Sequence, residues 1–288
     1  MVSAVGFDPT SRSSILFSAA KLPYEGFLYI REGKGMGRIF VRGDTHGQFG
    51  FLPQFCRENN TTKEDYLILL GDTGLNYGYI YDEMNTGLKW GEPLVDNSKS
   101  YREKIKQKIS NLPITLICIQ GNHDCRPEHI SSYQKIQCRG DLKCNCWVEK
   151  DYPNILFPDD GVITILGKKC LILGGAYSID KYWRVVHRRG YWYPDEQMSE
   201  KKKEEIFEII SKNNSYDYIF SHTCPLKYEP TELFLPFNYG EVDTSMEEFL
   251  EEVYNKITFT HWYCGHFHEN QPLTSNITLL LDEVVQLS

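Results

Sequence analysis

The sequence lacks the long apolar runs of membrane proteins, and no run approaches the ~20 residues that a transmembrane helix needs. The segment from Met1 to Asp8 has no basic start followed by a long apolar stretch, as a secretory signal would have. The nine cysteines form an odd number without a regular framework, which favours reduced thiols. We therefore expect a cytoplasmic protein that makes no use of a membrane.

A surplus of positive charge is also absent. The sequence has 31 Lys and Arg against 39 Asp and Glu, which gives a net charge of -8. That balance argues against broad, phosphate-driven binding to nucleic acid or to a membrane surface. A phosphorylated substrate remains compatible with it, because bound cations reverse the sign of a local site.

Internal repeats, low-complexity tracts and linkers are missing as well. A chain of 288 residues is long enough for one large domain. The simplest organisation is a single domain over residues 36–288, since Met36 directly precedes the first clear strand. Residues 1–35 are mixed in character, and we interpret them as an N-terminal extension without assigning its structure.

The sequence does contain a series of short apolar runs that are typical of strands. In the first half they alternate with helical patterns in a β-α-β-α-β order, which favours parallel strands with their carboxyl ends together. In the second half Gly167-Lys168 separates two such runs as a hairpin turn does, which indicates a partly antiparallel layer. The predicted strands are Gly37–Arg42, Tyr66–Leu70, Ile114–Ile119, Asn154–Phe157, Val162–Leu166, Lys169–Leu173, Asp217–Ser221, Phe259–Cys264 and Ile277–Leu281.

Four helical patterns lie between these runs. Three begin at serines that can cap a helix, namely Ser100, Ser199 and Ser245, and Glu103 completes a capping box with Ser100. The charged stretch Lys201–Glu205 is expected on a solvated face. The expected apolar faces are Leu52, Phe55 and Cys56; Tyr101, Ile105 and Ile109; Ile206, Ile209 and Ile210; and Met246, Phe249, Leu250, Val253 and Ile257.

Five of the apolar runs end in side chains that bind metal ions well. Carboxylate and amide oxygens together with imidazoles suit Mn, Fe or Zn better than Ca or a thiolate-type zinc site. The set is too large for one tetrahedral ion, and it suits two adjacent ions that share one carboxylate. Two ions about 3.5–4 Å apart form the usual clamp for in-line attack on phosphorus. The candidate ligands are Asp44, His46, Asp72, Asn122, His222, His266 and His268.

The order of these motifs resembles that of the calcineurin-like metallophosphoesterase superfamily. The motifs are Asp44-x-His46, Gly71-Asp72, Gly121-Asn122-His123-Asp124, His222 and Gly265-His266-x-His268, and they span most of the chain. The resemblance implies an α/β fold, a four-layer sandwich of two mixed β-sheets flanked by helices. It also implies a dinuclear site in which a metal-bridging hydroxide attacks phosphorus.

Carried over position by position, the resemblance divides the ligands between two divalent metal ions. Asp44, His46 and His268 would hold the first ion, and Asn122, His222 and His266 the second, with Asp72 bridging both. The catalytic residues would be His123 and Asp124: His123, oriented by Asp124, would stabilise the phosphoryl group or protonate the leaving oxygen.

The sequence departs from one branch of that superfamily, the Ser/Thr protein phosphatases. Those enzymes carry Gly-Asp-x-Val-Asp-Arg-Gly in the second motif and Glu where this chain has Asp124, whereas Asp72 here is followed by Thr73-Gly74-Leu75. The phosphate-gripping Arg is therefore missing. Arg126 is a candidate replacement through a bidentate contact, with a surface ion pair as an equally open reading. Arg184 is a weaker candidate of the same kind.

Two other groups of residues have open roles. Cys138, Cys144 and Cys146 fall in Arg126–Asp151, which we interpret as a polar loop, and their spacing is not standard for zinc, so free thiols are the favoured reading. The aromatics of the stretch after Asp72 can stack on a nucleobase or pack as a core or lid, and packing is favoured. They are Tyr77, Tyr79, Tyr81 and Trp90.

The function expected from the sequence is metal-dependent hydrolysis of phosphate esters. Monoesters are favoured over diesters, because nothing marks a nuclease and the net charge is negative. The expected partner is a phosphorylated small molecule or a phosphoprotein. A phosphodiesterase acting on nucleotides or nucleic acid is the first alternative. A catalytically idle scaffold is the second, although it predicts a damaged ligand set and the set here is complete.

Overall fold

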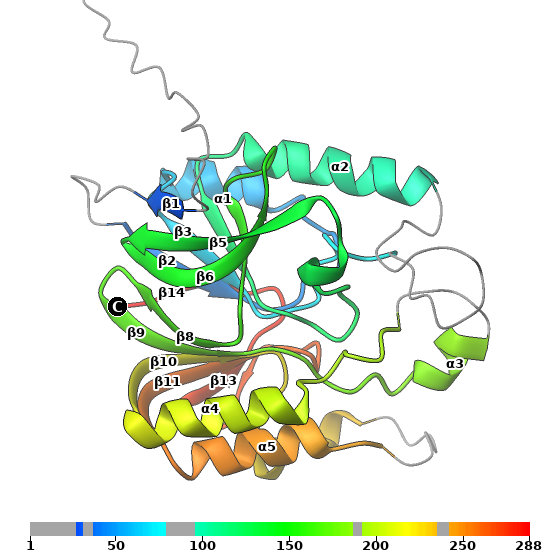
Figure 1. The fold of residues 1–288 in the computed structure, drawn as a ribbon, viewed down its shortest axis with the longest axis vertical. Helices are drawn as coiled ribbons and strands as arrows, with labels where there is room; N and C mark the ends of the chain where they lie inside the picture. The colour runs from blue at the N-terminus through cyan, green and yellow to red at the C-terminus, as the bar shows by residue number, and fades with distance from the viewer. Residues whose placement is uncertain (1–26, 31–36, 79–95, 187–191, 235–241) are drawn as a thin grey trace, which may run out of the picture.

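A computed structural model describes residues 27–30, 37–78, 96–186, 192–234 and 242–288 (Figure 1). The protein has an α/β fold with a large mixed sheet and few helices. The described strands follow one hydrogen-bonded path in the order β12-β13-β11-β10-β9-β8-β6-β7-β4-β3-β2-β14, with β1 and β5 paired beside it. The path divides into two mainly parallel halves, which meet at β6.

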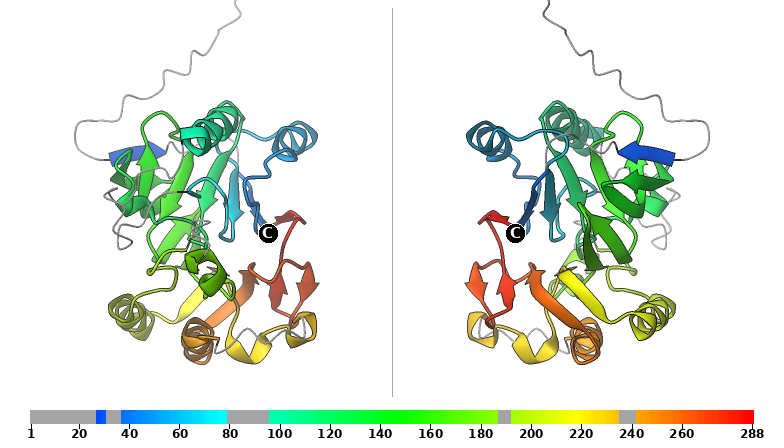
Figure 2. Two further views of the ribbon diagram at one scale, coloured as in Figure 1. Left: turned by 90° about the vertical axis from the view of Figure 1, so that its right-hand side faces the viewer. Right: turned by 90° about the vertical axis from the view of Figure 1, so that its left-hand side faces the viewer.

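The first half is built from four parallel strands: β2 (Ile39–Arg42), β3 (Tyr66–Leu69), β4 (Thr115–Cys118) and β7 (Ile155–Pro158). The short β14 (Val285–Gln286) extends it antiparallel to β2. Strands β3 and β4 are buried on both faces, as parallel strands under helices are. Helices α1 (Leu52–Asn59) and α2 (Asp96–Ser110) lie on its outer side (Figures 1 and 2).

The second half repeats this arrangement with β9 (Lys168–Leu173), β10 (Ser215–Ser221), β11 (Thr258–Cys264) and β13 (Ile277–Leu279) in parallel. Strand β8 (Gly161–Ile165) pairs antiparallel with β9, and strand β12 (Gln271–Pro272) pairs antiparallel with β13. Helices α4 (Glu200–Lys212) and α5 (Ser245–Tyr254) cover its outer side (Figure 2). The β8–β9 hairpin confirms the predicted hairpin, but its turn is Leu166-Gly167, one residue earlier than predicted, and both residues have positive φ.

The remaining described elements are short. Helix α3 (Lys181–Val186) follows β9, and strand β1 (Phe27–Ile30) pairs in parallel with β5. The N-terminal extension therefore contributes at least this strand, and its other residues lie outside the described ranges. The 3-10 helices are η2 (Pro127–His129), η3 (Leu226–Tyr228) and η4 (Thr231–Leu233).

The prediction of a polar loop at Arg126–Asp151 is wrong, because most of this segment forms an antiparallel hairpin. Strand β5 (Tyr133–Gly140) pairs with β6 (Leu142–Glu149), and β6 also pairs with β7 and β8. Buried and exposed side chains alternate along β6, so its many polar residues occupy the outer face of a half-buried strand. The hairpin thereby joins the two halves of the sheet.

Three apolar clusters fill the fold. One packs α1 and α2 against the first half, one packs α4 and α5 against the second, and the largest lies between the halves. Val41 and Ile68 from the first half meet Ile172 and Phe220 from the second in that central cluster. Among the described residues, no helix is long and apolar enough to cross a membrane.

Some helix ends and some helix faces differ from the predicted ones. Helix α2 begins at Asp96 rather than Ser100, and Tyr101 is 61% exposed instead of facing the core. Ser199 does cap α4, whereas the cap of α5 is Thr244. Lys203 is buried and not on a solvated face, because its amine donates to Glu200 and to the carbonyl of Ser245.

Candidate metal centre

The candidate ligands gather where the carboxyl ends of the parallel strands of both halves meet. Strands β2, β3 and β4 deliver the Asp44–His46 pair, Asp72 and Asn122, and β10 and β11 deliver His222 and the His266–His268 pair. Parallel strands end at the same edge of a sheet, so residues far apart in sequence come together there. The structure thus brings all the predicted ligands into one region.

The first group of ligands consists of Asp44, His46 and His268. Nε2 of His268 lies 3.3 Å from Oδ2 of Asp44, and Nε2 of His46 lies 3.7 Å from the same oxygen. The two Nε2 atoms are 2.9 Å apart. Two imidazoles and a carboxylate that converge so closely make a binding point for a cation.

The second group consists of Asp72, Asn122, His222 and His266. Nε2 of His222 lies 2.8 Å from Oδ1 of Asn122 and 3.9 Å from Oδ1 of Asp72. The ring of His266 lies 5.0 Å from that of His222, centroid to centroid. Asp72 lies close to both groups, because Asp44, Asp72 and His222 each offer an atom within 4.8 Å of the others.

Two observations show that these residues fit metal ions. Oδ2 of Asp44 is buried, and the groups that approach it in the described part of the chain are the Nε2 atoms of His268 and His46, at 3.3 and 3.7 Å. A buried carboxylate oxygen that faces two imidazole nitrogens forms a ligand set for a cation. The second observation is local strain, because His46, Asp72, His266 and His268 all have positive φ, between 44° and 72°. Strain of this kind persists where a site requires it.

Glycines beside the ligands allow this close approach. A Cβ on Gly121 would overlap the backbone nitrogen and Oδ1 of Asp72, and a Cβ on Gly71 would overlap the His222 ring. Glycine is therefore needed in both motifs for steric reasons.

The electrostatics of the cluster follow from its burial. Burial raises the pKa of Asp72 well above its ordinary value, and the nearby carboxylates of Asp44 and Asp124 raise it further. Burial also lowers the pKa of His266 to about 3, so this imidazole is neutral and can offer a lone pair. Bound divalent ions would offset the repulsion between the carboxylates.

His123 and Asp124 lie beside the second group but have different contacts. The His123 amide donates to Oδ1 of Asp72 at 2.9 Å, and burial, followed by the charge of Arg184, lowers the pKa of the His123 ring to about 2. The Asp124 carboxylate accepts hydrogen bonds from the backbone amides of Thr73 and Gly74. In this structure Asp124 therefore positions the loop that carries Asp72.

Comparison with known proteins identifies the family. A model of the calcineurin-like phosphoesterase family matches residues 37–270, which include every residue of the cluster. The chain belongs to the calcineurin-like phosphoesterases. No curated protein matches it. One crystal structure covers 87% of this chain and 98% of its own at 11% identity, with a TM-score of 0.46, which is too low for any argument.

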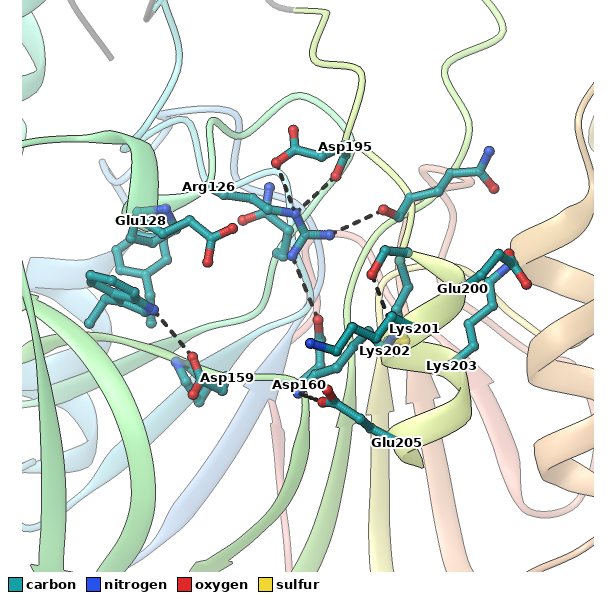
Figure 3. Close-up of a pocket in the computed structure, with 18 of the residues that line it drawn as sticks. Arg126, Glu128, Asp159, Asp160, Asp195, Glu200, Lys201, Lys202, Lys203 and Glu205 are labelled. Carbon is teal, nitrogen blue, oxygen red and sulfur yellow. Dashed lines mark hydrogen bonds and ion pairs between the residues drawn. The ribbon is translucent and has the colours of Figure 1, made fainter. Parts of the chain in front are cut away.

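The two predicted substrate arginines lie in different places in this calcineurin-like phosphoesterase. Arg126 faces a cavity of about 600 Å³ beside the start of α4, where it pairs with Asp160 and Asp195 and donates to the carbonyl of Gln197 (Figure 3). Arg184 of α3 lies with its Nη2 atom 3.3 Å from Nε2 of His123. The structure therefore brings Arg184, and not Arg126, to His123.

Sequence reasoning missed the contact that Tyr77 makes in the calcineurin-like phosphoesterase site. Its hydroxyl lies 2.7 Å from Nδ1 of His46, where it fixes the ring that turns Nε2 toward His268. The position of Tyr77 five residues after Asp72 gave no signal of this contact. Tyr79, Tyr81 and Trp90 lie outside the described residues.

Proposed function

We propose that this calcineurin-like phosphoesterase hydrolyses phosphate monoesters with two divalent ions. Asp44, His46 and His268 would hold one ion, Asn122, His222 and His266 the other, and Asp72 would bridge them. The observation that carries the proposal is the position of Asp72, which lies close to ligands of both groups.

When bound, such ions supply Lewis acidity toward phosphoryl oxygens and lower the pKa of an attacking water. The chain's own residues orient the substrate. The Nε of Arg184 pairs with Asp180 at 2.7 Å, and its two Nη groups would bind phosphoryl oxygens. His123 beside it contributes a hydrogen bond toward the phosphoryl group or the leaving oxygen. No covalent enzyme intermediate is part of this proposal.

The arginine beside His123 supports the preference for monoesters. A monoester carries more negative charge than a diester, so it gains more from a guanidinium that lies 3.3 Å from the imidazole. The ring of Tyr77 favours the alternative, a phosphodiesterase acting on nucleotides, because it lies 6.3 Å from the His123 ring and an aromatic face can stack on a base.

Turnover of p-nitrophenyl phosphate and of bis(p-nitrophenyl) phosphate tests this function, with Mn²⁺, Fe²⁺ or Zn²⁺ supplied in turn. We expect the monoester to be cleaved faster. Faster cleavage of the diester would favour the nucleotide alternative. No cleavage of either ester with any of the ions would favour a binding scaffold.

The proposal extends to the layers of the fold and to the setting of the protein. We propose that the layers are those of a four-layer sandwich of two mixed sheets, which is supported by the apolar clusters on both sides of each half. We also propose a cytoplasmic protein whose partner is a phosphorylated small molecule or a phosphoprotein. Free thiols at all nine cysteines are in keeping with a reducing compartment.

A further inference from the structure

Three cysteines lie on the inward face of the β5–β6 hairpin, and none of them belongs to the candidate metal centre. Cys138 on β5 stands directly opposite Cys144 on β6, and Ile136 stands opposite Cys146. Residues two apart on a strand share a face, so Cys144 and Cys146 point the same way. Cys138 therefore has one thiol across from it and another on the diagonal.

The three sulfur atoms are close enough to share one ligand. All of them lie within 4.8 Å of one another, and the sulfurs of Cys138 and Cys146 are 3.1 Å apart. Cys138 and Cys146 are buried, while Cys144 is only partly buried and leaves a route of entry.

A buried hydroxyl beside the cluster points to a missing partner. Tyr66 of β3 is fully buried in the same apolar cluster as Cys138 and Cys146. Its hydroxyl has no hydrogen-bond partner in the part of the chain that the structure describes. Burial raises the pKa of the Tyr66 hydroxyl, and negative charge at Asp141, Cys138 and Cys144 raises it further. A buried hydroxyl of this kind needs an acceptor or a ligand.

We propose that Cys138, Cys144 and Cys146 bind one thiophilic metal ion, Zn²⁺ or Cu⁺, in a site separate from the phosphoesterase centre. An all-sulfur donor set selects such ions over Mn²⁺ or Mg²⁺. The three thiols release their protons on binding, so that Zn²⁺ and three thiols give a complex with one negative charge and three free protons.

The expected role of this ion is to fix the hairpin that links the two halves of the sheet. Strand β6 pairs with β7 at Cys146 and Trp147 and with β8 at Leu142 and Lys143. A metal bond between β5 and β6 therefore stiffens the junction that sets the position of one half relative to the other (Figure 1). No redox change is needed, and all three sulfurs remain thiolates.

Titration of the reduced full-length protein with Cd²⁺ tests the proposal, because cadmium thiolates absorb in the ultraviolet whereas oxygen and imidazole ligands give no such band. We expect a band that saturates at one equivalent of Cd²⁺ and that is lost when Cu⁺, which binds thiolates more tightly, is added. This readout is independent of phosphoesterase activity. The titration is repeated with Asp72→Asn. The thiolate band is expected to persist there, because Asp72 is not a ligand of the cysteine site, and this result does not depend on the proposed function.

Two variants complete the experiment. Cys144→Ser changes the partly exposed thiol and is expected to remove most of the band, whereas Cys56→Ser, a buried cysteine of α1, is expected to retain it. Should Cys144→Ser misfold, the titration of the unmodified chain decides alone. Absence of a thiolate band in the unmodified protein would overturn the proposal. An equal band in both variants would do so too, as would a mass loss showing a Cys138–Cys146 disulfide under metal-free reducing conditions.

Discussion

The side-chain oxygen of Asn122 lies 2.8 Å from Nε2 of His222, although the two residues follow strands from opposite halves of the sheet. Nδ1 of His222 must donate to the carbonyl of Leu70 at 2.7 Å, and Nδ2 of Asn122 donates to Ser178. Burial lowers the pKa of His222, so the ring is neutral and its Nε2 is unprotonated. Two acceptors that face each other repel, and a cation between them removes the repulsion.

Substituting Asp72 is expected to weaken both halves of the centre. Asp72→Asn keeps the shape but removes the charge placed near both ligand groups, so Mn²⁺ binding should fall by at least roughly 100-fold at both sites. Calorimetric titration of the metal-free protein with Mn²⁺ measures this, since thiolates bind Mn²⁺ poorly. Two ions bound with unchanged affinity would refute the bridging position.

The two arginines provide a matched pair of variants. Arg184→Ala removes the guanidinium beside His123, and a charged hydrogen bond of about 1.5–3 kcal/mol corresponds to a loss of roughly 10- to 100-fold in kcat/KM. Arg126→Ala should change kcat/KM by less than about threefold, because Arg126 pairs with Asp160 and Asp195 away from the ligands. Equal losses from both variants would contradict this placement.

The glycine of the third motif tests the packing around Asp72. Gly121→Ala places a Cβ against the backbone nitrogen and carboxylate of Asp72, so we expect loss of metal binding and destabilisation of about 1–3 kcal/mol. Gly50→Ala is the control, since nothing lies within 4 Å of a Cβ added there. Metal content and thermal melting of both variants give the comparison, and normal metal binding in Gly121→Ala would show that the ligand loop has room.

A pH effect on stability is expected away from the metal centre. Burial raises the pKa of Glu247 in α5 to about 7 from 4.5, so the folded protein binds a proton there that the unfolded chain has already lost. Stability should therefore fall as pH rises from about 4.5 to 7, by up to about 3 kcal/mol. Above pH 7 the loss of stability caused by ionised Glu247 should stay constant.

The matched variants for this effect are Glu247→Gln and Glu248→Gln. Glu247→Gln removes the ionisation, so its melting temperature should exceed that of the unmodified chain at pH 8 by more than at pH 4.5. Glu248 is exposed on the same helix, and its substitution should leave the pH dependence unchanged. If the difference in melting temperature between Glu247→Gln and the unmodified chain became smaller as pH rises, the raised pKa of Glu247 would be contradicted.

The positions of the ligands could be predicted from sequence because each follows a buried strand. A run such as Tyr66–Leu70 specifies a buried parallel strand, and strands of this type share an edge, so Asp72 and Asn122 had to meet. The contacts of Asp124, Arg126 and Arg184 could not be predicted, because they depend on how loops fold over the strand ends. The β5–β6 hairpin was missed since its exposed face is rich in polar residues.

The central claim is that this site hydrolyses phosphate esters only with bound ions. The most direct test is p-nitrophenyl phosphate turnover by metal-stripped protein as Mn²⁺ is added, with Asp72→Asn measured in parallel. We predict no turnover without metal, turnover that saturates as Mn²⁺ fills the site, and at least a roughly 100-fold lower rate in Asp72→Asn. Turnover that is independent of metal, or equal in the two proteins, would contradict the claim.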